Sequence, residues 1–199
     1  MRGHCAYRRA GDLSQSLGAL VPLCGQLFEA APELREPASH PAVRFGIAMK
    51  KHAPITRKKM IQLLNEDLAR EFQAIIAYTV YSQTMKGAKY KGIADELKLH
   101  AGEELDHALQ IAKQIDYFNG TPVTTPKSVK LSAKPEDMLR FDLENEETTI
   151  RHYRDRIRQA EAMGEFALSE VLRKIIAQEQ EHLTDLADAL GIDNPAIKA

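Results

Sequence analysis

Two stretches of this 199-residue chain each place a glutamate three residues before a histidine. Glu104 precedes His107, and Glu179 precedes His182. Residues three apart in a helix lie on one face, so both side chains of a pair can reach a single point beyond it. Each pair interrupts a stripe of apolar residues at helical spacing, which would bury the glutamate. A buried carboxylate without a partner costs several kcal/mol, so something must compensate each one.

Two further glutamates, Glu71 and Glu146, interrupt apolar stripes of their own. Each follows two leucines at helical spacing and precedes an isoleucine four residues later. A tyrosine lies seven residues after each glutamate, at Tyr78 and Tyr153. Such tyrosines are commonly core residues with a hydrogen-bonded hydroxyl, and their matching positions leave open a role beside the site.

These eight residues form an internal repeat. The first and second glutamates of each half are 33 residues apart, and adding 75 to any position in the first half gives its counterpart in the second. The four positions of the first half are Glu71, Tyr78, Glu104 and His107, and those of the second are Glu146, Tyr153, Glu179 and His182. The repeat indicates that both halves contribute matching residues to one site.

Long helices must position these residues. Hydrophobic content of 44%, aromatic content of 6% and charged content of 28% are typical of a helical bundle. Thr56 can cap the first helix, and Gly87 can end it. The predicted helices run over about residues 57–86, 88–118, 136–163 and 165–190. The short breaks after the first and third helices predict two antiparallel hairpins.

The stretch from Thr121 to Pro135 contains three prolines and predicts an extended crossover between the hairpins. In this layout the four interrupted stripes face one another at mid-bundle. Four carboxylates carry a charge of −4, which two divalent ions would balance. Oxygen-rich ligands with two imidazoles and no thiolate favour iron or manganese over structural zinc.

The composition also excludes several classes of protein. A net charge of −1 gives no general attraction to nucleic acid. No apolar run approaches the roughly 20 residues that a membrane span needs. Cys5 and Cys24 form no Cys-x-x-Cys motif, which excludes a rubredoxin-type or zinc-ribbon site. We expect a cytoplasmic protein.

Residues 1–54 hold five prolines and both cysteines but no long periodic stretch, so we predict a disordered extension. An apolar run at residues 17–24 follows Arg8-Arg9, but Asp12 intervenes and no clear cleavage site follows, which favours an extension over a signal peptide. Met49 would also make a natural start, so the place of residues 1–48 in the mature protein stays open. The bundle is expected over 55–191, with a tail over 192–199.

From about Met60 to Leu190 the chain resembles the ferritin-like superfamily, and within it bacterioferritin. Besides the glutamates, histidines and Tyr78, the resemblance includes Leu63-Leu64-Asn65, Met138-Leu139-Arg140 and Asp142-Leu143. It implies an all-α, ferritin-like four-helix bundle of two antiparallel hairpins joined by one long crossover. It also implies a ferroxidase centre with Glu104 and Glu179 as bridging ligands, Glu71 and Glu146 as terminal ligands, and His107 and His182 as the remaining ligands.

The sequence departs from bacterioferritin at two points. Haem-binding bacterioferritins have Met immediately after the bridging glutamate of the second helix, where this chain has Leu105, so we do not expect haem there. Bacterioferritins also have a short fifth helix, and the stretch from Gly191 to Ala199 is too short for an ordinary one. Whether a closed cage forms therefore stays open.

The resemblance implies oxidation of iron(II) to iron(III) at two iron ions per chain, for storage or detoxification. The oxidant, dioxygen or hydrogen peroxide, stays open, as does manganese in place of iron. A rubrerythrin-like or hydroxylase-like oxidoreductase that keeps its metals is the alternative, and a non-catalytic helical interaction module is a third reading. We expect a homo-oligomer, either a dimer or a larger shell.

Three polar residues near the ligands complete the expectations. Glu103 and Gln178 precede the bridging glutamates and obey the same offset of 75. Each lies about 100° around its helix from the bridging glutamate. We therefore predict that Glu103 accepts a hydrogen bond from His182 and Gln178 one from His107. His100 lies one heptad before His107 and is expected to line the site rather than to act as a ligand.

Overall fold

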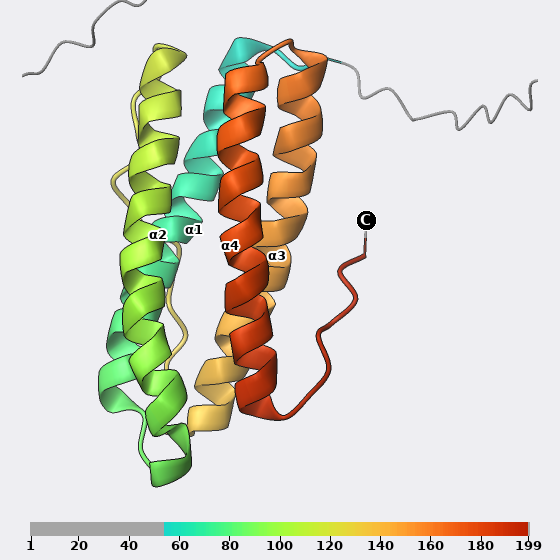
Figure 1. Cartoon of the computed structure of the whole chain (residues 1–199). Coiled ribbons are helices and arrows are strands. Elements are labelled where there is room, and N and C mark those ends of the chain that lie inside the picture. Colours follow the sequence, from blue (N-terminus) through green and yellow to red (C-terminus); the bar gives the residue numbers. More distant parts are fainter. Residues whose placement is uncertain (1–53, 199) are drawn as a thin grey trace, which may run out of the picture. The chain divides into compact units, whose positions relative to one another are not determined.

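The computed structural model describes residues 54–198, which form four long helices in two antiparallel hairpins (Figure 1). A single 3-10 turn, η1 (Ala88–Tyr90), joins the helices of the first hairpin, and no strand occurs in the described part of the chain. The helices are α1 (Arg57–Thr84), α2 (Lys91–Tyr117), α3 (Pro135–Ala162) and α4 (Phe166–Leu190). This arrangement confirms the predicted all-α four-helix bundle. Apart from Pro54, the expected N-terminal extension lies outside the described residues.

The helix ends follow the expected local chemistry. The Thr56 side chain accepts a hydrogen bond of 3.1 Å from the Lys59 backbone N–H and caps α1. Pro135 occupies the first turn of α3, where its missing N–H costs nothing. Gly191 ends α4 with φ of 68°, the left-handed conformation that glycine adopts without strain. The second predicted helix differs slightly, because its first three residues form η1.

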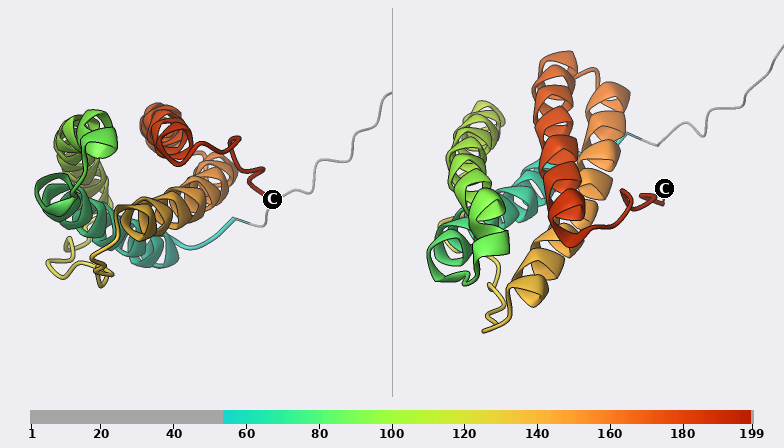
Figure 2. Two further views of the ribbon diagram at one scale, coloured as in Figure 1. Left: turned by 90° about the horizontal axis from the view of Figure 1, so that it is seen from below. Right: turned by 60° about the horizontal axis from the view of Figure 1, so that its bottom comes forward.

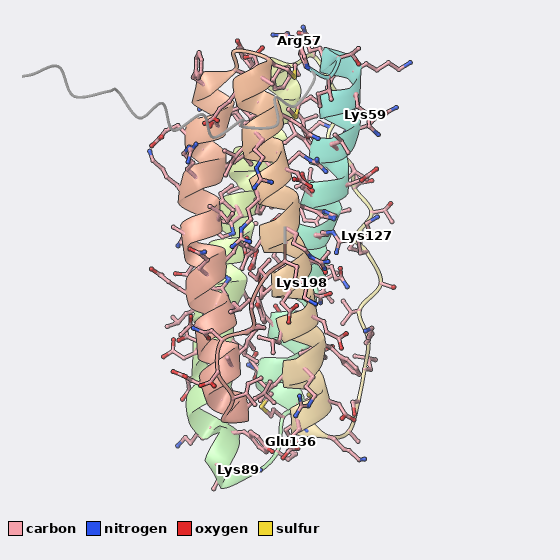
Figure 3. The ribbon with its side chains drawn as sticks, turned by 90° about the vertical axis from the view of Figure 1, so that its right-hand side faces the viewer. Arg57, Lys59, Lys89, Lys127, Glu136 and Lys198 are labelled. Atoms are coloured by element: carbon pink, nitrogen blue, oxygen red, sulfur yellow. The ribbon has the colours of Figure 1, made fainter. Side chains whose placement is uncertain are left out.

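The crossover between α2 and α3 is extended and is fixed to one face of α1, along which it runs in Figure 3. The Asn65 side chain donates to the Thr121 carbonyl at 3.1 Å and accepts from the Val123 N–H at 2.6 Å. Further along, the Gln73 side chain donates to the carbonyl of Ser128 at 2.8 Å. These bonds satisfy backbone groups that a prolonged extended segment would otherwise leave unpaired.

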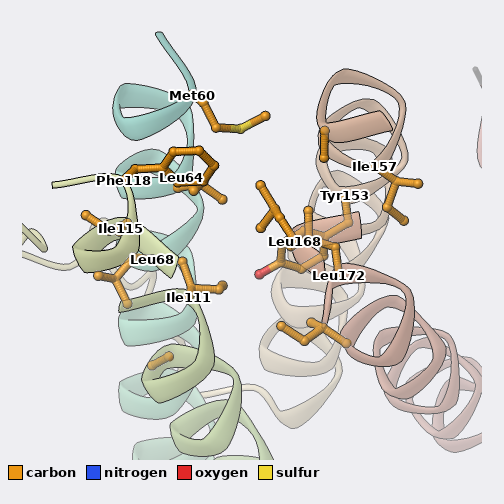
Figure 4. Close-up of a cluster of buried hydrophobic side chains, with 13 residues drawn as sticks. Met60, Leu64, Leu68, Ile111, Ile115, Phe118, Tyr153, Ile157, Leu168 and Leu172 are labelled. Carbon is orange, nitrogen blue, oxygen red and sulfur yellow. The ribbon is translucent and has the colours of Figure 1, made fainter. Parts of the chain in front are cut away.

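Two apolar clusters fill the bundle, and all four helices contribute to each. In the first, shown in Figure 4, side chains of α1 and α2 such as Met60 and Ile111 point toward those of α3 and α4 such as Leu172. The second lies toward the other end and includes Leu97 and Leu186. A layer of buried polar side chains lies between the two clusters. The view along the bundle in Figure 2 shows the four helices around this shared interior.

None of the helices within residues 54–198 combines the length and the apolar character that crossing a bilayer requires.

Replacing Gly120 by alanine should destabilise the bundle. Its Cβ would lie 2.6 Å from Ile61 Cγ2 and 3.0 Å from Ile115 Cγ2, and these methyls belong to stiff β-branched side chains. We expect a loss of about 1–3 kcal/mol in the free energy of unfolding, measured by urea denaturation. The control is Gly102→Ala on α2, where the new Cβ meets nothing within 4 Å. It should be neutral or stabilising by up to about 1 kcal/mol. Equal destabilisation by both changes would contradict the close packing at Gly120.

Candidate metal centre

The structure brings the six predicted ligand residues together in the polar layer between the apolar clusters. α1 and α3 each contribute one glutamate, and α2 and α4 each contribute a glutamate and a histidine one turn apart. Every one of these side chains is at most 2% exposed. The six are Glu71, Glu104, His107, Glu146, Glu179 and His182.

They form two overlapping groups, in each of which four ligand atoms lie within 4.8 Å of one another. The first group contains Glu71 and His107, and the second contains Glu146 and His182. Glu104 and Glu179 belong to both groups. Two metal ions held side by side need this arrangement, in which shared carboxylates can bridge the ions and the other residues bind one ion each.

The separations between nitrogen and oxygen atoms match those of ligands around a common ion. His107 Nδ1 lies 3.3 Å from Glu104 Oε2 and 3.1 Å from Glu179 Oε1. His182 Nδ1 lies 3.0 Å from Glu104 Oε1 and 3.6 Å from Glu179 Oε2. Two ligand atoms that are each about 2.0–2.2 Å from one ion are roughly 3–3.5 Å apart.

Several of these atoms are buried without a hydrogen bond, which gives a direct test of whether a metal fits. They are Glu71 Oε2, Glu104 Oε1, Glu146 Oε2, both carboxylate oxygens of Glu179, and His182 Nδ1. A buried polar atom without a partner is costly, so such a concentration requires an explanation. Atoms that bind a common ion lie close to one another, but they point at the ion and so do not form hydrogen bonds with one another. The residues present therefore fit a pair of metal ions.

Proton binding reflects the same crowding of charge. Burial raises the pKa of Glu71, and the charges of Glu104 and Glu179 raise it further. Burial and these two neighbours also raise the pKa of Glu146. Burial would raise the pKa of Glu104 as well, but its close contacts with the two histidines lower it overall. Burial opposes a charge on each histidine, yet the carboxylates raise both histidine pKa values. The raised pKa values mean that protons compete with cations for this site.

The two tyrosines bond crosswise to the terminal glutamates. The Tyr78 hydroxyl of α1 donates to Glu146 Oε1 of α3, and the Tyr153 hydroxyl of α3 donates to Glu71 Oε1 of α1. The two bonds are equivalent in the internal repeat, because Tyr78 and Tyr153 are counterparts 75 positions apart, and so are Glu71 and Glu146. Each bond leaves the other oxygen of its carboxylate free to face the cluster. The tyrosines therefore orient the terminal acids.

The predicted hydrogen bonds of the two histidines are confirmed. His107 Nε2 lies 3.0 Å from Gln178 Oε1, and His182 Nε2 lies 2.9 Å from Glu103 Oε2. Each bond directs the remaining ring nitrogen, Nδ1, toward the carboxylates. The Gln178 amide nitrogen also donates to Glu103 Oε1 at 3.5 Å, which joins the two bonds across α2 and α4.

The sequence did not identify the buried acids one turn before the terminal glutamates. Asp67 Oδ2 lies 2.8 Å from Arg156 Nε, so these two residues form a buried ion pair between α1 and α3. Asp142 is also buried, and one of its oxygens has no hydrogen bond. Asp67 and Asp142 are 75 positions apart, so the offset of the internal repeat could have pointed to both acids. His100 is buried as expected, and its ring lies 4.1 Å from that of His182 between centroids.

The comparisons with known proteins agree with this geometry. Residues 61–194 match the Ferritin family model, a ferritin-like domain, so the chain belongs to that family. It is similar to the bacterioferritin of Desulfovibrio desulfuricans, with 27% identity over 64% of this chain and 72% of that protein. The bacterioferritin of Brucella melitensis is 22% identical over 67% of this chain and 84% of its own length.

Two solved structures share the fold. One is a ferritin-like diiron-carboxylate protein from Bacillus anthracis, with 34% identity, a TM-score of 0.65, and coverage of 67% of this chain and 96% of that one. The other is a dodecameric thioferritin, the bacterioferritin-related protein of Bacteroides fragilis. It has 26% identity and a TM-score of 0.64, over 69% of this chain and 87% of that one. Membership of this family indicates a role in iron storage or di-iron chemistry.

Removing Glu103 should weaken metal binding without unfolding the bundle. Glu103→Ala frees the His182 ring, and losing such an orienting partner typically costs roughly 10- to 100-fold in metal affinity or activity. We expect a loss of that size in manganese(II) affinity, measured by calorimetry, with an unchanged circular dichroism spectrum. Asp106→Ala is the control, because Asp106 is an exposed acid that directly precedes the other histidine. Equal affinity in both variants would show that Glu103 does not orient His182.

Proposed function

We propose that this protein is a ferroxidase that oxidises iron(II) to iron(III) at a dinuclear centre, for iron storage or detoxification. The observation that carries the proposal is the pair of overlapping four-residue groups that share Glu104 and Glu179. The ligands of the two ions would be Glu71, Glu104, His107, Glu146, Glu179 and His182. Two iron ions, when bound, can each give one electron, so dioxygen or hydrogen peroxide receives two electrons together.

The protein's own residues have separate tasks in this proposal. Glu104 and Glu179 would contribute to holding both ions, and both side chains are buried. Glu71 and Glu146 would each help to hold one ion, and the tyrosine hydroxyls keep these two carboxylates in position. Glu103 and Gln178 hold the imidazoles in the orientation that presents Nδ1.

Iron and oxidant also need a route to the buried ligands. A narrow cavity between α1 and α3 reaches all four glutamates. Its other lining residues are Arg70, Gln73, Ala74, Asn145 and Thr149. One arginine, three uncharged polar side chains and one alanine therefore line the passage between the site and the surface on this face.

We propose in addition that copies of this chain form a closed homo-oligomeric shell. The support is the relationship to bacterioferritins and to a thioferritin described as dodecameric. A shell can retain the iron(III) product, which a single bundle has no space to store.

Aerobic addition of iron(II) tests the proposal. We expect the purified protein to bind about two metal ions per chain at the dinuclear centre, to oxidise iron(II), and to elute as a large assembly in size-exclusion chromatography. Glu104→Ala and Glu179→Ala should each lose the metal pair and the oxidation, because each acid would contact both ions. The matched control is Glu181→Ala, which removes an exposed acid of α4. Unchanged metal content in both bridging variants would remove the proposed site, and a dimer with a persistent metal pair would indicate a fixed-site oxidoreductase instead.

Haem should not be held by the second helix. Leu105 occupies the position after the bridging Glu104, it is 49% exposed, and a leucine side chain has no atom that can bind iron. We expect no Soret band in protein purified after expression with added haem precursor. As a positive control, Leu105→Met supplies a thioether at this position. A Soret band in the wild type that is lost on mutating another methionine of the bundle would contradict this expectation.

A further inference from the structure

A second cluster of metal-ligating side chains lies outside the six-residue centre, between α2 and α4. It consists of Glu96 and His100 of α2 and Asp185 of α4, whose ligand atoms all lie within 4.8 Å of one another. We propose that these three residues form an additional site for a divalent transition-metal ion. The proposal extends the ferroxidase function, but the site itself can be tested by metal binding alone.

The geometry is that of a ligand set rather than of a simple surface acid cluster. His100 is only 3% exposed, and its Nε2 is directed at Asp185, 3.2 Å from Oδ2. Glu96 lies one helical turn before His100, so its carboxylate lies on the same face. Nitrogen and oxygen ligands about 2.0–2.2 Å from one ion are themselves roughly 3–3.5 Å apart, which the separation between His100 and Asp185 matches.

The charges in this cluster also require a partner. A hydrogen bond between His100 and Asp185 pairs the imidazole with one carboxylate. It leaves the negative charge of Glu96 close to that of Asp185. Within residues 54–198, neither Glu96 nor Asp185 forms an ion pair with a lysine or an arginine. Lys89 borders the same surface depression, but its Nζ pairs with Glu136 Oε1 at 2.9 Å, at the end of the bundle seen in Figure 3. A bound cation would balance the two carboxylates.

The site is open to solvent on one side and adjoins the dinuclear centre on the other. The Asp185 side chain is 44% exposed and lines the depression together with Ile93 and Asp188. On the inner side, the ring of His100 lies 4.1 Å from that of His182, between centroids. The depression is therefore separate from the cavity between α1 and α3, and it is bordered by Glu96, Asp185 and Asp188.

Successive ligand groups connect the surface to the centre through shared histidines. His100 belongs both to the surface group and to a second group with Glu103 and His182. His182 belongs in turn to the dinuclear centre, together with Glu104. Two carboxylates and one imidazole suit iron(II), manganese(II) or cobalt(II). In a ferroxidase, the surface site would hold iron(II) one side chain away from the ligands of the centre.

Equilibrium dialysis of the metal-free protein against cobalt(II) tests this inference. We expect about three cobalt ions per chain in the wild type, one more than the two that the dinuclear ligand set implies. Glu96→Gln and Asp185→Asn each remove one ligand from a solvent-facing position, and each should reduce the count to about two. Asp188→Asn is the matched control, since Asp188 borders the depression without belonging to the ligand group. It should keep the third ion.

Measurements in a Glu104→Ala variant distinguish a failure of the additional site from a failure of the proposed dinuclear centre. Glu104→Ala should lose the dinuclear pair but keep one cobalt ion, and adding Asp185→Asn should remove that ion. The same cobalt count in the wild type, Glu96→Gln and Asp185→Asn would overturn the additional site. A count lowered by Asp185→Asn but unchanged by Glu104→Ala would support the additional site and contradict the dinuclear centre instead.

Discussion

Burying four carboxylates in one layer of an apolar bundle is the constraint on which this structure depends. Each buried charge requires compensation, and within residues 54–198 two imidazoles and two tyrosine hydroxyls contact these carboxylates. Hydrogen bonds do not satisfy all of the oxygens, and several are directed at common points between the helices. Two divalent ions would balance the charge and satisfy these oxygens together. The apolar clusters on either side hold the helices so that the glutamates cannot escape to solvent.

The duplicated arrangement explains how one chain builds such a site. Each hairpin contributes a terminal glutamate, a bridging glutamate and a histidine, and the long crossover places the second hairpin against the first. The hydrogen bonds of the tyrosines also connect the two hairpins. Tyr78 of the first hairpin bonds to Glu146 of the second, and Tyr153 of the second bonds to Glu71 of the first. The centre therefore forms only when both hairpins pack together. Packing of the two hairpins therefore also brings the six ligand side chains together.

Periodicity in the sequence was sufficient to predict the helices and the six clustered side chains, because an acid in an apolar stripe identifies both a helix face and a buried position. The crossover was predicted from its three prolines. The bonds of His107 and His182 were also predictable, since Gln178 and Glu103 obey the same offset. The pairing of Asp67 with Arg156 was not predicted, because it depends on how closely α1 approaches α3. The convergence of His100 with Asp185 likewise depends on the register of α2 against α4, which no spacing within one helix specifies.

Anomalous diffraction from crystals loaded with manganese(II) tests the central claim most directly. Within the layer between the apolar clusters, the account predicts two peaks in each chain, about 3.5–4 Å apart, whether or not the additional site is also occupied. Glu104 and Glu179 should contact both peaks, with His107 at one and His182 at the other. An empty layer, or a single peak that neither shared glutamate contacts, would contradict the account.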